Sequence, residues 1–126
     1  GTVELAEQKG KKVVLLDFWA TYCPPCRVAM PTLAEVAKEY ESKGVLYLAV
    51  NGGEHPARVQ SFLKSTGLKM HVPLDKDGRV ANLYNVYGIP ALVIVDKKGI
   101  VRATHVGPLP NLKPVLSQAL DAILGS

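Results

Sequence analysis

The chain contains two cysteines, Cys23 and Cys26, separated by Pro24 and Pro25. They follow an apolar run over residues 13–20 and precede a helical pattern. A cysteine at the start of a helix lies near unpaired backbone N–H groups, where the positive end of the helix dipole favours the thiolate. We therefore predict that Cys23 attacks and that Cys26, shielded one turn further along, resolves the mixed disulfide. The prolines suit a first helical turn, which loses no N–H partner to them.

Two other uses of this cysteine pair are weaker interpretations. A zinc site needs four ligands, but the chain has no further cysteine, and its histidines are scattered singly at His55, His71 and His105. A structural disulfide that closes so short a loop stabilises a fold very little. The pattern therefore predicts a redox-active dithiol that needs no metal and no further cofactor.

The composition predicts a single domain over residues 1–126, because 48% of the side chains are hydrophobic and can form one core. The net charge is +4, but the basic residues are spread among eleven acidic ones, which argues against a nucleic-acid site. No apolar stretch approaches membrane-spanning length, and no charged-then-apolar leader precedes the domain. Since the sequence begins Gly1-Thr2, we expect that a signal peptide, an anchor or another N-terminal segment was removed.

The sequence around the cysteines predicts a βαβ unit. Residues 12–19 are almost continuously apolar, which predicts a strand buried on both faces. A helix should follow the cysteines and stop at Lys43-Gly44, with Pro31 expected to kink it rather than break it. Residues 45–50 form a second apolar strand, so the crossover is expected to be right-handed. The apolar face of the helix is formed by Leu33, Val36, Ala37 and Tyr40.

A helical stretch should follow before the chain returns to the sheet. Pro56 opens a helix that Gly67 closes, and an extended piece over 72–74, a turn over 76–78 and a short helix come next. The apolar faces of these two helices are formed by Val59, Phe62, Leu63 and Thr66, and by Val80, Leu83 and Tyr84.

The last part of the chain predicts a hairpin and a helix. Strands over 91–95 and 100–106 are joined by residues 96–99, whose turn chemistry indicates antiparallel pairing. Asn111 is the expected N-cap of the final helix. Its apolar repeat consists of Leu112, Val115, Leu116, Ala119, Leu120 and Ile123.

This order, with the motif at residues 17–27 and Gly88-Ile89-Pro90, resembles the thioredoxin superfamily over nearly the whole chain. The segments 50–54, 56–66 and 73–75 resemble its TlpA/ResA-like branch. The resemblance implies an α/β fold with a central mixed sheet flanked by helices, and an inserted helical segment between the βαβ and ββα halves. It also implies an extracytoplasmic thiol-disulfide oxidoreductase, periplasmic or held at the outer face of the inner membrane.

Asp17 lies within the apolar first strand, so we expect its carboxyl to be desolvated and its pKa raised. Such a group can accept the proton of Cys26 near neutral pH, and the resemblance places an acid here. The alternative is an inert residue at the edge of the strand, paired with a lysine.

The resemblance implies that the Ile89-Pro90 bond is cis and faces the cysteines. Its preceding backbone would then pair with an extended substrate, and Ala91 would help to shape the groove. A plain trans proline at the start of a strand is the alternative. The predicted substrate-contacting residues are Trp19, Tyr22, Pro24, Pro25, Ile89 and Pro90.

Glu54 occupies a position where the TlpA/ResA-like pattern has an acid near the active site, so it is a candidate modulator; a solvated loop glutamate is the alternative. The sequence departs from that pattern at three positions. Ala29 stands where a glutamate often follows the second cysteine. Asp17 replaces an asparagine found in some members, and Tyr22 replaces the usual tryptophan.

These observations predict a monomeric thiol-disulfide oxidoreductase that reduces disulfides in other proteins. The resemblance implies that the substrate is an apocytochrome c in a cytochrome c maturation pathway. It also implies that the electron donor is a membrane protein or a thioredoxin-type protein. We expect no nucleic-acid partner, and contact with a membrane only through a segment outside this chain.

Two rival functions are weaker. A thiol peroxidase of the same fold would need a Pro-x-x-x-Thr-x-x-Cys arrangement, which does not precede Cys23. A copper chaperone would hold Cu(I) with the two cysteines and a further soft or imidazole ligand. The candidates for that ligand are Met70, His71 and His105.

Overall fold

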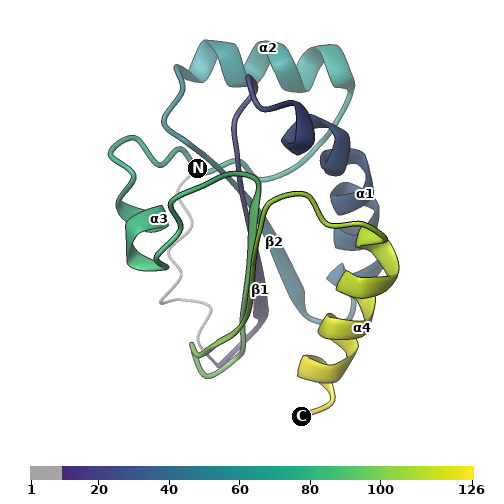
Figure 1. The fold of residues 1–126 in the computed structure, drawn as a ribbon. Coiled ribbons are helices and arrows are strands. Elements are labelled where there is room, and N and C mark those ends of the chain that lie inside the picture. The colour runs from purple at the N-terminus through teal and green to yellow at the C-terminus, as the bar shows by residue number, and fades with distance from the viewer. Residues whose placement is uncertain (1–9) are drawn as a thin grey trace.

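The protein is represented by a computed structural model (Figure 1), in which residues 10–126 are described. Its described part contains four strands and four helices in the order βαβααββα. Their bounds are β1 (Val13–Trp19), α1 (Pro24–Glu41), β2 (Val45–Asn51), α2 (Pro56–Thr66), α3 (Arg79–Leu83), β3 (Ala91–Val95), β4 (Val101–Val106) and α4 (Leu112–Leu124).

The strands form one mixed sheet in the order β2-β1-β3-β4. β1 pairs in parallel with β2 and antiparallel with β3, and β4 pairs antiparallel with β3. β1, the strand that leads to the cysteines, is therefore central, which explains why all seven of its residues are buried. The predicted mixed sheet with inserted helices is confirmed.

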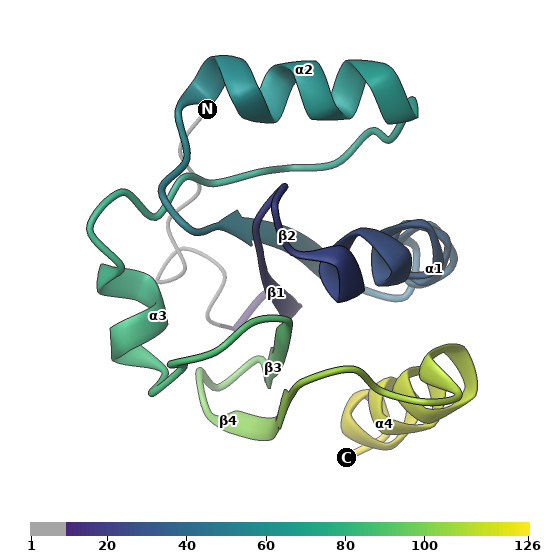
Figure 2. The ribbon, with the colours of Figure 1, turned by 45° about the horizontal axis from the view of Figure 1, so that its top comes forward.

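Alternation along β1 divides the core between the two faces of the sheet. Val13, Leu15 and Trp19 pack in a cluster with residues of α1, α2 and α4. Val14, Leu16 and Phe18 pack in a second cluster, which Val80, Ala81 and Tyr84 partly cover. Figure 2 shows α1 and α4 on one side of the strands and α3 on the other.

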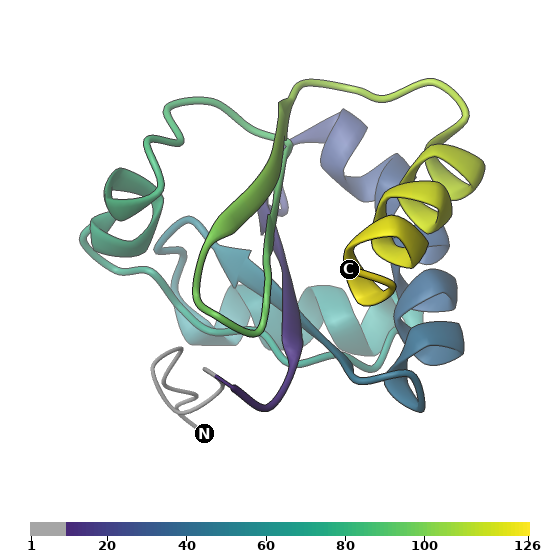
Figure 3. The same cartoon turned by 90° about the horizontal axis from the view of Figure 1, so that it is seen from below.

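The first cluster is the larger one because two long helices lie over it. In Figure 3 the yellow α4 runs beside the blue α1. Their contact includes the Tyr40 hydroxyl, which donates to Asp121 Oδ1 at 2.7 Å and to the Ser117 carbonyl at 3.1 Å. Lys113 of α4 also forms an ion pair with Glu39 of α1. These contacts hold α1, which begins at the dithiol, against α4.

Local predictions about helices were partly right. Pro31 does not break α1, which continues through it as one helix, as predicted. Asn111 does occupy the N-cap position of α4, but its side chain makes no capping hydrogen bond. Its backbone is left-handed, at φ 56° and ψ 44°, whereas a capping side chain requires extended geometry. Leu83 and Val115 are exposed, because α3 is only five residues long and Val115 lies at the margin of the apolar face of α4.

The hairpin and the extended piece were predicted correctly. The turn between β3 and β4 is held by Asp96 Oδ1, which accepts from the Lys98 and Ile100 amides. The segment near Leu74 adds an isolated parallel bridge to Asn51 at the end of β2. No helix within residues 10–126 combines the length and apolar character of a membrane span.

Candidate active site

The two cysteines form a disulfide at the start of α1, with their Cα atoms 5.3 Å apart. Cys23 is the N-cap residue of this helix, and its Sγ accepts a hydrogen bond from the Cys26 amide at 3.3 Å. The Cys26 amide at the positive end of the helix therefore donates to the Cys23 sulfur, which favours a thiolate there after reduction. Cys23 is 8% exposed and Cys26 is 1% exposed, so the first sulfur is the more accessible one.

Asp17 lies two residues before Trp19 on β1 and is fully buried. Burial raises its pKa from 3.8 to about 7, and a hydrogen bond from Tyr47 opposes that shift. The prediction of a desolvated acid with a raised pKa is confirmed, and the alternative of a strand-edge residue paired with a lysine is wrong. Its catalytic role stays a proposal.

Sequence reasoning missed Tyr47, whose hydroxyl donates to Asp17 Oδ2 at 2.7 Å. The signal was present in β2, where this is the only side chain with a hydroxyl. Ala49 pairs directly with Asp17, and Tyr47 precedes Ala49 by two residues. Because side chains two apart on a strand share a face, the register alone places the tyrosine on the side of Asp17.

A groove of about 460 Å³ opens beside Asp17. Its walls come from the first turns of α1, from the start of β3 and from the segment that leads into α4. The Ile89-Pro90 bond is cis, as the resemblance implied, and Pro90 lines this groove together with Pro24 and Pro25. Ala29 also lines it, at the position where the resemblance suggested a glutamate.

A second groove of about 280 Å³ contains the other predicted contact residues, Trp19, Tyr22 and Ile89. Tyr22 and Ile89 are exposed there. Trp19 is completely buried and donates from Nε1 to the Ala49 carbonyl at 3.0 Å. Its predicted contact with substrate is therefore corrected to support of the groove from within the core. Tyr87, which sequence reasoning missed, is 80% exposed on the same groove.

Glu54 is not a solvated loop residue, because its side chain is only 8% exposed. Its carboxylate accepts hydrogen bonds from the Thr21 amide at 2.6 Å, the Thr21 hydroxyl at 2.5 Å and Asn51 Nδ2 at 2.9 Å. Burial alone would raise the pKa of Glu54, but these bonds and the charge of Arg58 outweigh it and lower the pKa. Glu54 thus holds the loop that immediately precedes Cys23.

Gly53 permits this arrangement. It has a φ of +84°, and a Cβ at this position would lie 2.9 Å from the Lys76 carbonyl oxygen. A side chain here would therefore collide with backbone as well as strain the left-handed conformation. The loop that carries Glu54 is packed directly against the segment that follows the bridge at Leu74.

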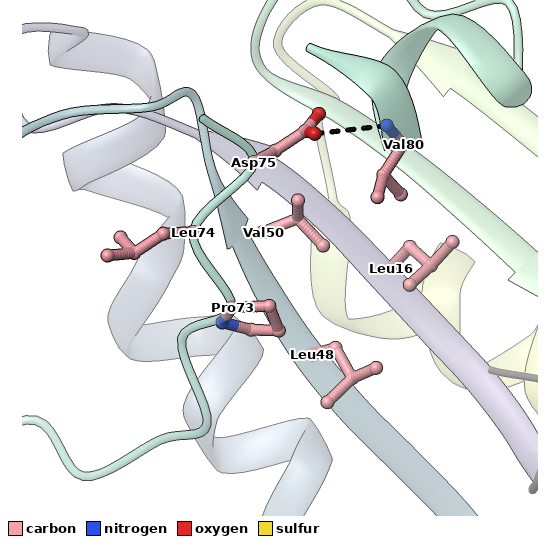
Figure 4. Close-up of a pocket in the computed structure, with 7 residues that line it drawn as sticks. All are labelled: Leu16, Leu48, Val50, Pro73, Leu74, Asp75 and Val80. Carbon is pink, nitrogen blue, oxygen red and sulfur yellow. Dashed lines mark hydrogen bonds between the residues drawn. The ribbon is translucent and has the colours of Figure 1, made fainter. Parts of the chain in front are cut away.

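That same segment forms a small apolar pocket of about 50 Å³ on the α3 side of the sheet (Figure 4). Asp75 is the one charged side chain in its lining. Its two carboxylate oxygens accept from the Val80 and Ala81 amides, each at 3.0 Å. This is a helix cap, which Gly78 at the N-cap position of α3 cannot supply. The pocket is therefore structural and separate from the dithiol.

Across residues 10–126 the structure brings together no group of three His, Cys, Asp or Glu side chains able to hold a metal ion. His105 Nε2 instead lies 3.4 Å from the Pro108 carbonyl oxygen, and Met70 packs against the larger apolar cluster. The copper interpretation gains no support from these positions.

Comparisons with known proteins agree with this geometry. Residues 1–122 match the Redoxin family. The thiol-disulfide oxidoreductase ResA of Halalkalibacterium halodurans is 36% identical over 106 residues, which are 84% of this chain and 60% of that protein. This chain thus spans about three fifths of the length of that relative.

Two solved structures extend the comparison. A Chlorobium tepidum protein described as thiol:disulfide interchange protein DsbE superposes with a TM-score of 0.89 at 36% identity, covering 98% of this chain and 86% of the other. A secreted disulfide oxidoreductase of Mycobacterium tuberculosis superposes with a TM-score of 0.78 at 27% identity, covering 93% and 85%. With a dithiol at the N-terminus of α1, a cis proline at β3 and these relatives, the chain belongs to the redoxin family, as a ResA-like member with the thioredoxin fold.

Proposed function

We propose that this protein is a thiol-disulfide oxidoreductase that reduces disulfide bonds in other proteins. The observation that carries the proposal is the Cys23–Cys26 disulfide at the N-terminus of α1, where the outer sulfur accepts a helix N–H. Such a position stabilises a thiolate, which is the attacking species in thiol–disulfide exchange. The relatives named as oxidoreductases support this activity.

In the proposed reaction the reduced dithiol gives up two electrons. The Cys23 thiolate attacks one sulfur of the partner's disulfide, forming a mixed disulfide and releasing the other sulfur as a thiolate that takes a proton from solvent. Cys26 then loses its proton and attacks the Cys23 sulfur. The Cys23–Cys26 bond forms, the bond to the partner breaks, and the second partner sulfur leaves as a thiolate that is protonated. The partner is reduced and the dithiol is oxidised.

Asp17 is the proposed acceptor of the Cys26 proton. Cys26 is buried, so bulk water cannot take its proton directly, whereas Asp17 lines a groove beside the first turns of α1. With a pKa of about 7, the carboxyl is both a competent base and a competent acid near neutral pH. It can return the proton when an electron donor reduces the disulfide again.

The proposed partner surface is the rim around the dithiol. Tyr22, Tyr87 and Ile89 are exposed on one groove, and Pro24, Pro25 and Pro90 line the other. Apolar and aromatic side chains of this kind suit an extended, unfolded segment of a partner protein. Ala91, paired with Val106 at the start of β3, fixes where that segment would meet the sheet.

The finer proposal is a reductant of cytochrome c maturation type that works outside the cytoplasm. Its support is the ResA-like membership and the secreted Mycobacterium tuberculosis neighbour. The proposed substrate is then an apocytochrome c, and the proposed electron donor is a membrane or thioredoxin-type protein.

Equilibration with a glutathione or dithiothreitol series tests the direction of electron flow by giving the reduction potential of the couple. A value near that of thioredoxin, about −270 mV, is expected for a reductant, and one near that of DsbA, about −120 mV, contradicts it. A couple that does not cycle at all contradicts the oxidoreductase function and directs attention to copper titration.

Trapping tests the two cysteine roles separately. Cys26→Ser should accumulate mixed disulfides with an oxidised protein substrate, because nothing resolves them. Cys23→Ser is the matched control and should accumulate none, since Cys26 is buried. Equal trapping by both variants would contradict the assignment of Cys23 as the attacking residue.

A further inference from the structure

Within the described residues, Tyr47 is the side chain that hydrogen-bonds Asp17, although it lies 30 residues away in the sequence. Its ring is buried in the larger cluster, in the same apolar environment as Cys26. A hydroxyl placed so deeply usually has a partner, and here the partner is Asp17 Oδ2 at 2.7 Å. The contact joins β2 to β1, so it depends on the register of the sheet.

The register explains how the tyrosine reaches this carboxyl. Ala49 pairs with Asp17, and Leu15 pairs with Tyr47. Because Ala49 carries only a methyl group, the space opposite Asp17 is left to the tyrosine ring two residues earlier on the same face. The Tyr47 hydroxyl then donates its hydrogen bond to Oδ2 of Asp17. Within residues 10–126, Oδ1 accepts no hydrogen bond, and Asp17 lines the groove beside α1.

We propose that Tyr47 is a positioning residue for the proton transfer at the dithiol, holding Oδ2 of Asp17 so that Oδ1 receives the Cys26 proton. This inference rests on the proposed function and deepens it. The transfer breaks the Cys26 S–H bond and forms an O–H bond at Oδ1, directly or through water in the groove. Tyr47 keeps its own proton throughout.

The electrostatics agree with a fixed donor. Burial, then the charge and hydrogen bond of Asp17, raise the pKa of Tyr47 well above its ordinary value, so the hydroxyl remains protonated wherever Asp17 titrates. Its bond stabilises the carboxylate and lowers the pKa of Asp17 against the effect of burial. Without it, the carboxyl would hold its proton to higher pH.

The other elements around Asp17 supply few competing titratable groups. From β3 the paired residue is Leu92, and from β4 His105 is opposite Leu92, two strands away from Asp17. The residues of α1 and α4 that line the groove beside Asp17 carry no titratable side chain; they are Pro24, Pro25, Val28, Ala29, Thr32, Leu33 and Leu112. His105 is thus the group whose titration must be separated from that of Asp17.

The test follows the two phases of reaction between the reduced protein and 5,5′-dithiobis(2-nitrobenzoate). The first phase reports attack by Cys23 and the second reports resolution by Cys26. In Tyr47→Phe the pH midpoint of the second phase should rise by about one unit, because a hydrogen bond to a charged group is lost. At pH 7 the second phase should slow about fivefold, with the first phase unchanged within about twofold.

Tyr40→Phe is the matched control, since it removes another buried tyrosine hydroxyl that donates to a carboxylate at 2.7 Å, away from the dithiol. It should move neither phase. Asp17→Asn should abolish the pH midpoint of the second phase. Adding Tyr47→Phe to that variant should cause no further change in the rate or the pH dependence of the second phase. His105→Gln should leave the midpoint in place.

An unmoved midpoint in a folded Tyr47→Phe variant would overturn this inference alone. A wild-type protein without a second phase would overturn it together with the proposed function. If Tyr47→Phe does not fold, the Tyr47 ring resonances of the wild-type protein provide the test. They should shift with the pH midpoint of the second phase, and resonances that stay constant from pH 5 to 9 would overturn the proposal.

Discussion

Asp17, which is buried, and Glu54, which is less completely buried, are two carboxyl groups whose pKa values shift in opposite directions. Asp17 receives one hydrogen bond, from Tyr47, and burial raises its pKa to about 7. Glu54 is also desolvated, but donors from Thr21 and Asn51 converge on it and lower its pKa. The opposite shifts follow from two differences, because Asp17 is almost completely buried with one donor, whereas Glu54 is less completely buried and accepts from several donors.

The difference separates two tasks. A carboxyl that is half ionised near neutral pH can exchange a proton with a thiol, so Asp17 suits chemistry. A carboxylate that stays ionised is a constant acceptor, so Glu54 suits the fixing of the loop at Thr21. The differences in burial and in hydrogen-bond partners thus suit Asp17 to its proposed proton transfer and Glu54 to holding the loop.

The largest effect is expected for Asp17→Asn, measured by urea unfolding of the oxidised protein. The folded-state pKa of Asp17 is raised from 3.8 to about 7, so its contribution to stability is fully present below pH 4 and is lost as the pH rises through 7. The asparagine has no charge to desolvate. The variant should be more stable than wild type at pH 8, by at most about 4 kcal/mol, and nearly equal to it at pH 4. A gain that is the same at both pH values would contradict the raised pKa.

The second-largest effect on stability is expected for Gly53→Ala, which disturbs the backbone of the loop that carries Glu54. The added Cβ would meet the Lys76 carbonyl oxygen at 2.9 Å in a left-handed conformation. We expect a loss of about 2 to 3 kcal/mol in the free energy of unfolding. Gly78→Ala is the matched control, since its φ is +69° and no atom lies within 4 Å of the added Cβ. It should lose only about 1 kcal/mol. Equal losses would show that close packing of this loop is unimportant.

Glu54→Gln should cost about 1 to 2 kcal/mol at pH 7, because one of two acceptor oxygens becomes an NH₂ that faces the Thr21 donors. The folded-state pKa of Glu54 is lowered, so its stabilisation is present above the ordinary value of 4.5 and is lost as the pH falls through the folded-state pKa. The difference from wild type should therefore shrink towards pH 3 in urea titrations. Glu41→Gln, an exposed substitution at the end of α1, is the control and should show no such pH-dependent difference in stability. If it does, the difference seen for Glu54→Gln arises from the change in surface charge.

The smallest effect is expected for Arg58→Ala. Its guanidinium is 4.0 Å from Glu54 Oε2 and its side chain is 65% exposed, so solvent screens the pair. The free energy of unfolding should change by no more than about 0.5 kcal/mol. A larger loss, measured in the same titrations, would show that the ion pair, rather than the hydrogen bonds, lowers the pKa of Glu54.

Much of the fold follows from local patterns. The apolar runs at β1 and β2, the proline that opens α2 and the glycine that closes it were all readable, because each depends on near neighbours in sequence. One local prediction failed for a reason that lies outside the local sequence. Asn111 has the residue type of a cap but a left-handed backbone, and the chain's path into α4, which tertiary packing sets, determines that backbone.

For the site, the placement of residues 17 and 23–26 could be predicted from the order of residue types alone. A C-x-x-C between a strand and a helix, with an acid in the strand, specifies a dithiol at a helix N-terminus and a desolvated carboxyl nearby. Membership in the redoxin family agrees with that interpretation. Local sequence was sufficient here because strand, turn and helix are consecutive.

The hydrogen-bond partners of the two carboxyl groups could be identified only from the tertiary structure. Tyr47 lies 30 residues from Asp17, and Thr21 lies 33 residues from Glu54. Such pairs depend on the register of β1 against β2 and on the packing of Gly53 against Lys76. Because pKa values respond to donors within hydrogen-bonding distance, the opposite shifts at Asp17 and Glu54 arise only when the sheet and its loops have closed around them.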